Sequence, residues 1–395
     1  MQIKDAYIVD AVRSAVGRAG KGTLSRTRPE AMGGDVIQAL LAKYPSFPAD
    51  RIDDVLIGCA MPEGAQGMNM GRLIAQKAGL PDSVPGATVN RFCSSGLQTI
   101  ALASQSIATG MASAIVAGGV ESMSLVPMTG FYYQPDPDLI KTDANVYVSM
   151  GNTAENVAEK FQVSRIDQDE FALRSHQKAI NAVDSGVFSD EIVPLTVRSV
   201  DFESGKRQEK TFIFDHDEGP RRDSSAEALA SLRPVFRKGG SVTAGNSSQM
   251  SDGAAAALLV GESQLKEYGL RPMARLVSFA VAGVAPELMG IGPIEAVPKA
   301  LKLAGLKISD IGLIELNEAF ASQSLAVIRQ LNLNPEIVNV HGGAIALGHP
   351  LGCTGAKLTA TLLHEMIRRK VRYGLCTMCI GGGMGAAGIF ENLQL

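Results

Sequence analysis

The sequence has no tryptophan, and aromatic residues make up only 5% of its 395 positions. It has no excess of either charge, because 37 basic and 40 acidic residues leave a net charge of −3. Proteins that bind nucleic acids non-specifically carry concentrated positive charge, so nucleic acid is not an expected partner. No apolar run approaches the roughly 18 residues of a transmembrane helix, and we expect no membrane span. With 46% hydrophobic residues, the chain is predicted to be globular with a sizeable core.

Cysteine is also scarce, with five scattered residues: Cys59, Cys93, Cys353, Cys376 and Cys379. An odd, widely spaced set does not suit the disulfide framework of a small secreted protein and favours a reducing, cytoplasmic compartment. The segment Cys376–Cys379 matches the C-x-x-C pattern of metal and redox sites. It lies in an expected strand, however, where residues three apart point to opposite faces, and no second cysteine pair or paired histidine accompanies it. We therefore expect no metal.

Glycine, in contrast, is abundant, with 42 residues. This is about 11% of the chain, against an average near 7%. Glycine lets two backbones approach closely and adopts conformations that other residues avoid. Many glycines lie in expected turns or after expected strands: Gly118, Gly119, Gly342, Gly343, Gly348, Gly352 and Gly381 to Gly385. This placement predicts tightly packed layers and open space beside the strand ends for a bulky substrate.

The first twelve residues mix charged side chains into an apolar stretch, which predicts an opening strand rather than a signal peptide. Five basic residues follow, and we expect them to lie in a solvated loop rather than in a transit peptide: Arg13, Arg18, Lys21, Arg26 and Arg28.

Two parts of the chain repeat the order strand, turn, helix, strand, glycines. The first runs from Val89 through an expected strand at 114–117, and the second runs from Val338 through a helix at 356–370 and a strand at 375–380. Strands that alternate with helices predict βαβ units, mostly parallel sheets and functional residues at the strand ends. We therefore expect a duplicated α/β chain.

The chain is predicted to divide into halves at residues 1–270 and 271–395. Residues 125–240 differ in composition and are predicted to be an insertion that caps the first half, a common location for substrate specificity. This insertion is expected to contain an amphipathic helix over 165–185.

Cys93 lies in the segment Asn90–Gly96, where a strand is expected to end and a helix to begin. At a helix N-terminus the helix dipole and free N–H groups lower the pKa of a thiol and can hold an oxyanion. This position therefore makes Cys93 a candidate nucleophile. The alternative is a buried structural cysteine, which is the more common role of a lone cysteine.

Three other polar residues occupy comparable positions. His349 precedes a proline, which keeps it out of helical geometry and on a loop, although it could equally be a simple turn residue. Cys379 ends an expected strand before three glycines, and Asn317 follows the apolar strand at 313–316. If the strand ends meet, two thiols, a histidine and an asparagine share one crevice.

The motifs resemble those of the thiolase family, and most closely the degradative 3-ketoacyl-CoA thiolases (acetyl-CoA acyltransferases). The resemblance covers essentially the whole chain and depends on six segments: Asn90–Gln98, Gly118–Ser122, Gly245–Ala256, Asn317–Ala321, Gly342–Gly355 and Cys379–Gly385. It implies the thiolase fold, in which two similar βαβαβαββ halves form a five-layered α/β/α/β/α body with a loop domain inserted in the first half.

The resemblance also implies roles for particular residues. Cys93 corresponds to the acylated nucleophile, His349 to the residue that activates it, and Cys379 to the thiol that acts as acid and base. Asn317 would hold a water that forms one oxyanion hole with His349 Nε2, and the backbone N–H groups of Cys93 and Gly381 would form the other. The implied reaction is the cleavage of 3-ketoacyl-CoA by CoA in fatty-acid β-oxidation.

Coenzyme A is expected as a co-substrate, with no permanently bound cofactor. The resemblance suggests six contact residues: Arg221, Phe236, Ala244, Ser248, Met150 and Phe320. Arg221 has an alternative as a solvated loop charge beside Arg222. Ser149, where biosynthetic relatives often have histidine, favours the degradative type, and His341 is expected to be a non-essential loop residue.

The family implies homodimers, which often pair into tetramers, and a hydratase–dehydrogenase subunit is a further candidate partner. Two other functions stay open. The first is an acetoacetyl-CoA thiolase working in the condensing direction, and the second is a non-catalytic acyl-CoA-binding protein. The presence of both Cys93 and Cys379 favours an enzyme.

Overall fold

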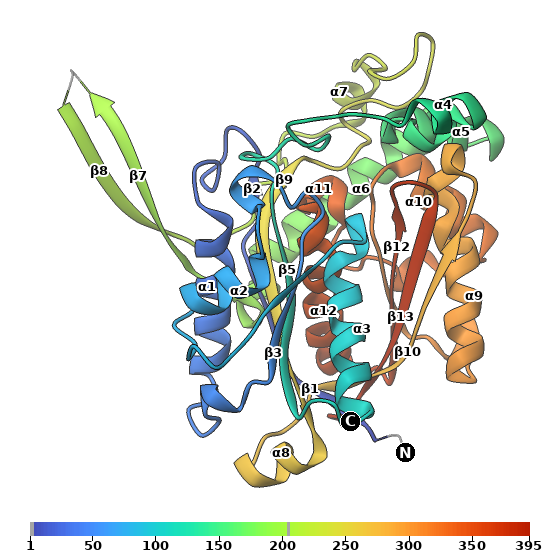
Figure 1. The fold of residues 1–395 in the computed structure, drawn as a ribbon. Coiled ribbons are helices and arrows are strands. Elements are labelled where there is room, and N and C mark those ends of the chain that lie inside the picture. The colour runs from blue at the N-terminus through green and yellow to red at the C-terminus, as the bar shows by residue number, and fades with distance from the viewer. Residues whose placement is uncertain (1–3, 204–205) are drawn as a thin grey trace.

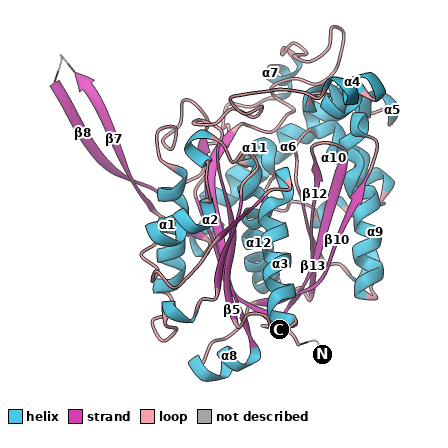
Figure 2. Ribbon diagram, in the orientation of Figure 1, coloured by secondary structure: helices cyan, strands magenta, loops and turns pink. Residues whose placement is uncertain are grey.

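The structure is a computed structural model that describes residues 4–203 and 206–395. Most of its strands join into one large sheet, and two others form a separate hairpin (Figures 1 and 2). The main path of hydrogen-bonded strands is β11-β12-β13-β10-β1-β9-β5-β3-β4, while β2 pairs with β9 and β6 pairs with β1. The strands of the first half are β1 (Ala6–Ser14), β2 (Gly17–Arg18), β3 (Asp54–Gly58), β4 (Ala87–Val89), β5 (Ala114–Ser122), β6 (Ile192–Val193) and β9 (Ser251–Gly261). Those of the second half are β10 (Ala274–Gly283), β11 (Leu313–Leu316), β12 (Tyr373–Ile380) and β13 (Met384–Asn392). The predicted opening strand begins at Ala6, and residues 1–3 lie outside the described residues.

The sheet is mixed, which corrects the expectation of mostly parallel strands. Parallel pairing joins β3 to β4 and β5, and β11 to β12. In the middle of each half one strand, β9 or β13, pairs antiparallel with both neighbours. The turn from β12 to β13 contains Gly382 and Gly383, whose φ values of 80° and 84° suit glycine and return the chain alongside itself.

The helices complete a five-layered arrangement, as the thiolase resemblance implies. Among the described residues, the two halves of the sheet are joined by a short β1–β10 pairing at Tyr7–Arg275 and Ile8–Ala274, and α3 and α12 lie between them (Figure 1). Helices α1 and α2 cover the outer face of the first half, and α9 and α10 cover that of the second. These helices are α1 (Pro29–Ala42), α2 (Met70–Lys77), α3 (Ser95–Ala108), α9 (Gly292–Ala304), α10 (Ala321–Gln330) and α12 (Leu351–Arg368).

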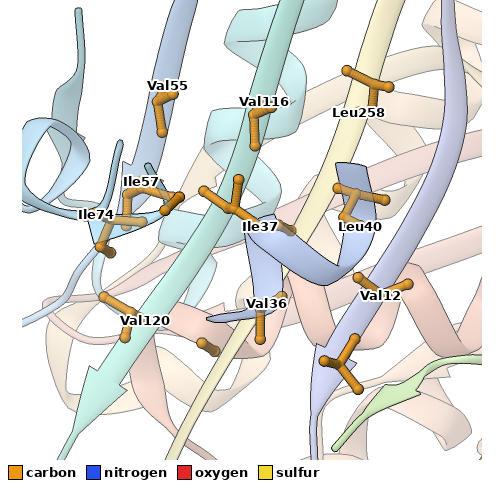
Figure 3. Close-up of a cluster of buried hydrophobic side chains, with 14 of the residues drawn as sticks. Val12, Val36, Ile37, Leu40, Val55, Ile57, Ile74, Val116, Val120 and Leu258 are labelled. Atoms are coloured by element: carbon orange, nitrogen blue, oxygen red, sulfur yellow. The ribbon is translucent and has the colours of Figure 1, made fainter. Parts of the chain in front are cut away.

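Apolar clusters fill the spaces between the layers. In the cluster of Figure 3, Val36, Ile37 and Leu40 of α1 pack on strand residues such as Val116 and Leu258. Their spacing places them on one face of the helix, and burying this face removes apolar surface from water. The described residues contain no helix that is long and apolar enough to cross a membrane.

The central helices α3 and α12 are in close contact because glycine faces each neighbouring backbone. A Cβ atom on Gly96 would lie 2.7 Å from the backbone nitrogen of Ala356, and one on Gly355 would lie 2.3 Å from that of Leu97. Both distances are shorter than van der Waals contact. The glycine excess noted in the sequence therefore sets the separation of the two helices that lead out of the candidate site.

The inserted region forms helices and a hairpin: α4 (Pro137–Thr142), α5 (Met150–Lys160), α6 (Arg165–Asp184), β7 (Leu195–Glu203), β8 (Lys206–Phe214) and α7 (Ala226–Ala230). The predicted amphipathic helix is α6, which begins after Ser164, whose hydroxyl accepts the backbone N–H of Asp167. The insertion was expected to cap the first half. In part it does, because β6 pairs with β1, and Val193, Leu195, Val197 and Phe214 join the apolar cluster under α1. Helices α5 and α6, however, pack on α10 and α11 (Ala344–Leu347) of the second half. The β7–β8 hairpin stands out from the body (Figure 1), and α8 (Glu262–Tyr268) follows β9.

Arg13 corrects the expectation of a solvated basic loop. Its side chain is fully buried, and its guanidinium donates to Glu191 at 2.5 Å and to Asp217 at 2.8 Å. A buried charge is stable only when it is paired in this way. Because both carboxylates belong to the insertion, Arg13 anchors the insertion to β1.

Candidate active site

Four segments bring the predicted catalytic residues to one region. Cys93 lies in a 3-10 turn that leads directly into α3, and His349 lies two residues before α12. Asn317 follows β11, and Cys379 lies at the end of β12, which is paired in parallel with β11. The site is thus built from the beginnings of the two central helices and the ends of two neighbouring strands.

His349 has a defined tautomer because of its hydrogen bonds. Its Nδ1 lies 2.6 Å from Thr354 Oγ1, and that hydroxyl donates its own proton to the carbonyl of Pro350 at 3.0 Å. The hydroxyl must therefore accept from Nδ1–H, which leaves Nε2 with a lone pair. This Nε2 lies 3.3 Å from the side-chain nitrogen of Asn317, which can donate to it.

The charge state of His349 is set by burial. The side chain is only 5% exposed, and burial together with the positive charge of Lys357 lowers its pKa to about 3. At physiological pH the ring is therefore neutral and has a basic nitrogen available. This is the state that a general base needs before it accepts a proton.

The Cys93 thiol does not have the low pKa expected from its position before a helix. Burial raises its pKa to about 12, although the backbone N–H groups of Gly381 and of Cys93 itself act in the opposite direction. The preceding residue, Phe92, has a φ of 43°, a left-handed conformation that is rare for an aromatic residue and marks local strain. Desolvation outweighs the helix N-terminus here, so the thiol is protonated unless a base removes its proton.

Cys379 is a close neighbour of Cys93. Burial and the proximity of Cys93 raise the pKa of the Cys379 thiol. It packs in an apolar cluster with Phe320 and Met289, against which Met150 also packs. Cys376, three residues earlier on β12, belongs instead to the cluster around α12. The two thiols thus face different layers, as the strand alternation predicted.

The residues suggested for CoA contacts fall into two groups. Arg221 and Ala244 line a cavity of about 210 Å³. Met150 and Phe320 lie beside Cys379, and the rings of Phe236 and Phe320 meet edge to face with centroids 6.1 Å apart. Ser248 donates its backbone N–H to the carbonyl of Ala319, close to the second group. Arg222, next to Arg221, forms an ion pair with Asp184 outside this cavity.

Two family models together match almost all of the chain. The model described as "Thiolase, N-terminal domain" matches residues 6–263, and the one described as "Thiolase, C-terminal domain" matches residues 270–392. The chain belongs to the thiolase family.

Individual thiolases match along their full length. A 3-ketoacyl-CoA thiolase of Bacillus subtilis (strain 168) is 55% identical over 390 residues, which cover 98% of this chain and 100% of the relative. An acetyl-CoA acetyltransferase of Escherichia coli (strain K12) is 46% identical, with coverage of 99% and 100%. The crystal structure of the Bacillus anthracis acetyl-CoA acetyltransferase superposes with a TM-score of 0.90 at 41% identity and covers 99% of this chain and 100% of its own.

Two buried carboxylates hold this thiolase site together, and sequence reasoning missed both. Glu318 accepts hydrogen bonds from Ser175, Asn339 and the backbone of Ile345, and so ties the segment after β11 to the loop before His349. Glu121 accepts from the backbone of Ala60 and Gly352 at 2.8 and 2.7 Å. The only signal in the sequence for these two residues was that each is an acidic residue in a motif whose other residues are mostly small or apolar.

Gln249 was also missed, although it lies in a motif used for the resemblance. Its side-chain nitrogen donates to the carbonyls of Gly219 and Ile345 at 2.9 and 3.0 Å. Its own carbonyl accepts the backbone N–H of His349 at 3.1 Å. It therefore links the loop that carries Arg221 to the loop that carries His349.

Proposed function

We propose that this thiolase cleaves 3-ketoacyl-CoA with CoA to give acetyl-CoA and a shortened acyl-CoA, through an acyl group on Cys93. The observation that carries the proposal is the neutral His349, with an unprotonated Nε2 beside Asn317, in a site that also contains the neighbouring thiols of Cys93 and Cys379. The 55% identity to a 3-ketoacyl-CoA thiolase supports the same reaction.

The first half-reaction begins with proton transfer from Cys93 Sγ to His349 Nε2. The resulting thiolate attacks the 3-keto carbon, and the Cα–Cβ bond breaks to give acyl-Cys93 and the carbanion of acetyl-CoA, which Cys379 protonates. Covalent capture divides a difficult C–C cleavage into two easier steps. Because desolvation raises the pKa of the Cys93 thiol, its thiolate is destabilised and therefore reactive, and an adjacent base is needed to form it.

Two groups of donors stabilise the oxygen anions of this reaction. Once His349 Nε2 has accepted a proton, it becomes a donor beside Asn317. Asn317 Oδ1 is buried and has no hydrogen-bond partner among the described residues, which suits a bound water that donates to it and to the substrate oxygen site. The N–H groups of Cys93 and Gly381 form the second oxyanion hole.

The second half-reaction returns the enzyme to its starting state. The Cys379 thiolate takes the proton of the CoA thiol, and the CoA thiolate attacks acyl-Cys93. The acyl group leaves on CoA, and Cys93 regains its proton from His349. CoA is a co-substrate here. Its proposed contacts are the six residues suggested by the resemblance: Arg221, Ala244, Ser248, Met150, Phe236 and Phe320.

The experiment is a thiolysis assay with acetoacetyl-CoA and 3-ketohexadecanoyl-CoA, each with CoA. The reaction is monitored by the loss of absorbance of the magnesium enolate of the 3-ketoacyl-CoA. Cys93→Ala is expected to abolish turnover, and undiminished activity in this variant rules out the assigned nucleophile. Cys379→Ser is expected to reduce turnover by about 10²–10⁴-fold, because a positioned acid–base group contributes this much. Cys376→Ser is the matched control, since it changes a buried thiol on the same strand that faces away from the site.

The second candidate is an acetoacetyl-CoA thiolase that works in the condensing direction, which is favoured by the relatives named acetyl-CoA acetyltransferase. The ratio of rates between the two substrates decides between them. Turnover restricted to the four-carbon substrate supports the second candidate. CoA binding without turnover of either substrate supports a non-catalytic protein instead.

A further inference from the structure

Glu315 is a buried acidic residue that has no role in the reaction described above. It lies on β11, two residues before Asn317, and is only 1% exposed. Its neighbour across the parallel pairing with β12 is Cys376, which packs in the cluster around α12. Asn317 continues this pairing, since its backbone N–H donates to the carbonyl of Thr377 at 3.0 Å. Because paired residues of neighbouring strands, and residues two apart on one strand, point to the same face, Glu315 and Asn317 both face α12.

Lys357 is a buried cation on the helix that Glu315 faces. Helix α12 packs on β11, and the spacing of Thr354, Lys357 and Thr361 places them on one face of this helix. Thr354 accepts the Nδ1 proton of His349 at one end of the face. Thr361 donates to Glu191 at 2.9 Å at the other end. Lys357 therefore lies between the catalytic base and a buried carboxylate.

One oxygen of Glu315 lacks a partner. Its Oε1 is buried without a hydrogen bond in the described part of the chain, so Lys357 does not bind it directly. The two charges are nevertheless close enough to act on one another. Burial raises the pKa of Glu315, and the positive charge of Lys357 is the largest influence that opposes this rise. A buried water that accepts from the ammonium and donates to Oε1 would satisfy the unpaired oxygen and link the two side chains.

The other charged groups around Glu315 and Lys357 have partners of their own. They come from several elements: Arg13 on β1, Glu191 before β6, Asp217 after β8, Glu318 after β11 and Glu365 on α12. Arg13 donates to Asp217 at 2.8 and 3.0 Å and to Glu191 at 2.5 Å. Glu365 pairs with basic residues of its own helix, and the donors to Glu318 are described above. Among these carboxylates, Glu315 is the one with an unsatisfied buried oxygen.

We propose that Glu315 and Lys357 are positioning residues that, linked by a buried water, hold the end of β11 against α12 and so keep Asn317 beside His349. This role depends on the proposed function, in which these two side chains act together. The contact that is held is the 3.3 Å approach of the Asn317 side-chain nitrogen to His349 Nε2. Each residue of this contact lies on the same segment as one member of the pair, so a shift of β11 along α12 changes the site directly.

Two substitutions each remove one charge and nearly keep the side-chain length: Glu315→Gln and Lys357→Met. Each is expected to lower kcat by about 10–100-fold and to leave KM for CoA within about 2-fold, because a small misplacement of catalytic groups affects the chemical step. In the double variant the loss is expected to be smaller than the product of the two single losses, as for residues that act as a unit. Lys357→Arg keeps the charge and is expected to retain most of the turnover that Lys357→Met loses.

Thr361→Val is the matched control, because it removes another buried polar group from the same face of α12 but not one that faces Glu315. Its melting temperature is expected to fall while kcat stays within about 2-fold of the wild type. A loss of kcat in this control as large as that in Lys357→Met overturns the proposal. Single losses that simply multiply in the double variant overturn it as well. If Lys357→Met does not fold, the comparison of Glu315→Gln with Thr361→Val still decides.

Nuclear magnetic resonance of the site gives a readout that does not depend on turnover. In Lys357→Met, loss of the positive charge is expected to raise the pKa of His349 above its value of about 3, and Lys357→Arg is expected to leave it unchanged. In Glu315→Gln, the signals of His349 Nε2 and of the Asn317 side-chain amide are expected to move, and in Thr361→Val they are expected to stay.

The failure of this proposal and that of the proposed function can be told apart. Site signals that are unchanged in both Glu315→Gln and Lys357→Met overturn the positioning role, even if the wild type is an active thiolase. If the wild type turns over no 3-ketoacyl-CoA, the proposed function fails, and the same signals still decide whether the pair holds Asn317 beside His349.

Discussion

His349 receives its tautomer and its charge from different neighbours. Thr354 lies one turn inside α12 and holds the proton on Nδ1, because its own hydroxyl proton is used by the Pro350 carbonyl. Burial and the charge of Lys357, two turns inside the same helix, keep the ring neutral. The base is therefore prepared by the helix that follows it, before any substrate arrives.

This arrangement predicts the nuclear magnetic resonance behaviour of the His349 ring. Between about pH 5 and 8, where an ordinary histidine titrates, its nitrogen signals are expected to stay constant and to report a neutral ring protonated on Nδ1. The signals are assigned by their loss in His349→Gln. In Thr354→Val, which removes the acceptor for Nδ1–H and keeps the side-chain shape, the neutral ring is expected to show a mixture of tautomers. A wild-type ring that titrates near its ordinary pKa contradicts this account.

Sequence motifs predicted which residues lie together in the site better than they predicted the pKa or the burial of individual side chains. Cys93, His349, Cys379 and Asn317 were predicted from their positions at strand ends and helix beginnings, and the structure brings their segments together. The expected lowering of the Cys93 pKa was wrong, because burial depends on side chains from distant segments and outweighs the local helix dipole. The same limit applies to Arg13, whose carboxylate partners lie about 200 residues away in the sequence.

Among the secondary-structure elements, the pair α3 and α12 controls the distance between the nucleophile and the base. Each helix begins beside one of these residues, and the glycines at their crossing let the backbones touch. A sequence pattern predicts each helix from its own residues. It does not show that Gly96 faces the backbone of Ala356 or that Gly355 faces that of Leu97, since these contacts join the two halves of the chain.

Gly355→Ala tests the crossing directly. The added Cβ would lie 2.3 Å from the backbone nitrogen of Leu97, so the helices must separate. We expect a loss of stability of about 1–3 kcal/mol, typical of overpacking, with a larger fractional loss of turnover than of CoA affinity. Gly261→Ala is the control, because its Cβ would meet only ordinary contacts, the nearest at 3.5 Å, and its φ is −81°. Urea unfolding and steady-state kinetics measure both, and an unchanged melting curve for Gly355→Ala contradicts the close crossing.

Gln249 joins two loops, and this predicts a combined effect on binding and catalysis. Gln249→Met preserves the length of the side chain but removes the donor to Gly219 and Ile345. Both carbonyls then lose a partner, which costs about 1–3 kcal/mol for a buried group. Because these loops carry Arg221 and His349, KM for CoA is expected to rise while kcat falls, each several-fold. An effect on KM alone means that the His349 loop keeps its position without the amide.

On the scale of the whole molecule, the insertion connects the two halves, because it packs on both of them. Helices α5 and α6 pack on α10 and α11, while Arg13 of β1 holds the segments around Glu191 and Asp217. His176 on α6 and Arg221 on the held loop consequently reach the cavity from the insertion, while Ile345 reaches it from the second half. Composition indicated where the insertion lies in the sequence, but not which surface it covers, because its helices carry apolar faces that could pack on either half.

The two buried neutral histidines predict how the stability of the fold depends on pH. The pKa values of His349 and His176 fall to about 3 and about 4 in the folded protein, below the value of 6.5 for a free side chain. Between these limits the unfolded chain binds more protons than the folded one, so acid favours unfolding. Each histidine contributes full stability above about pH 6.5 and loses up to about 1.4 kcal/mol per pH unit below it. In urea unfolding at a series of pH values, His349→Gln and His176→Asn are each expected to lower the slope of free energy against pH by about this amount over that window. Comparison with the wild type removes the contribution of the carboxylates, because these titrate in all three proteins. If the variants have the same slope as the wild type, neither ring is held neutral by the fold.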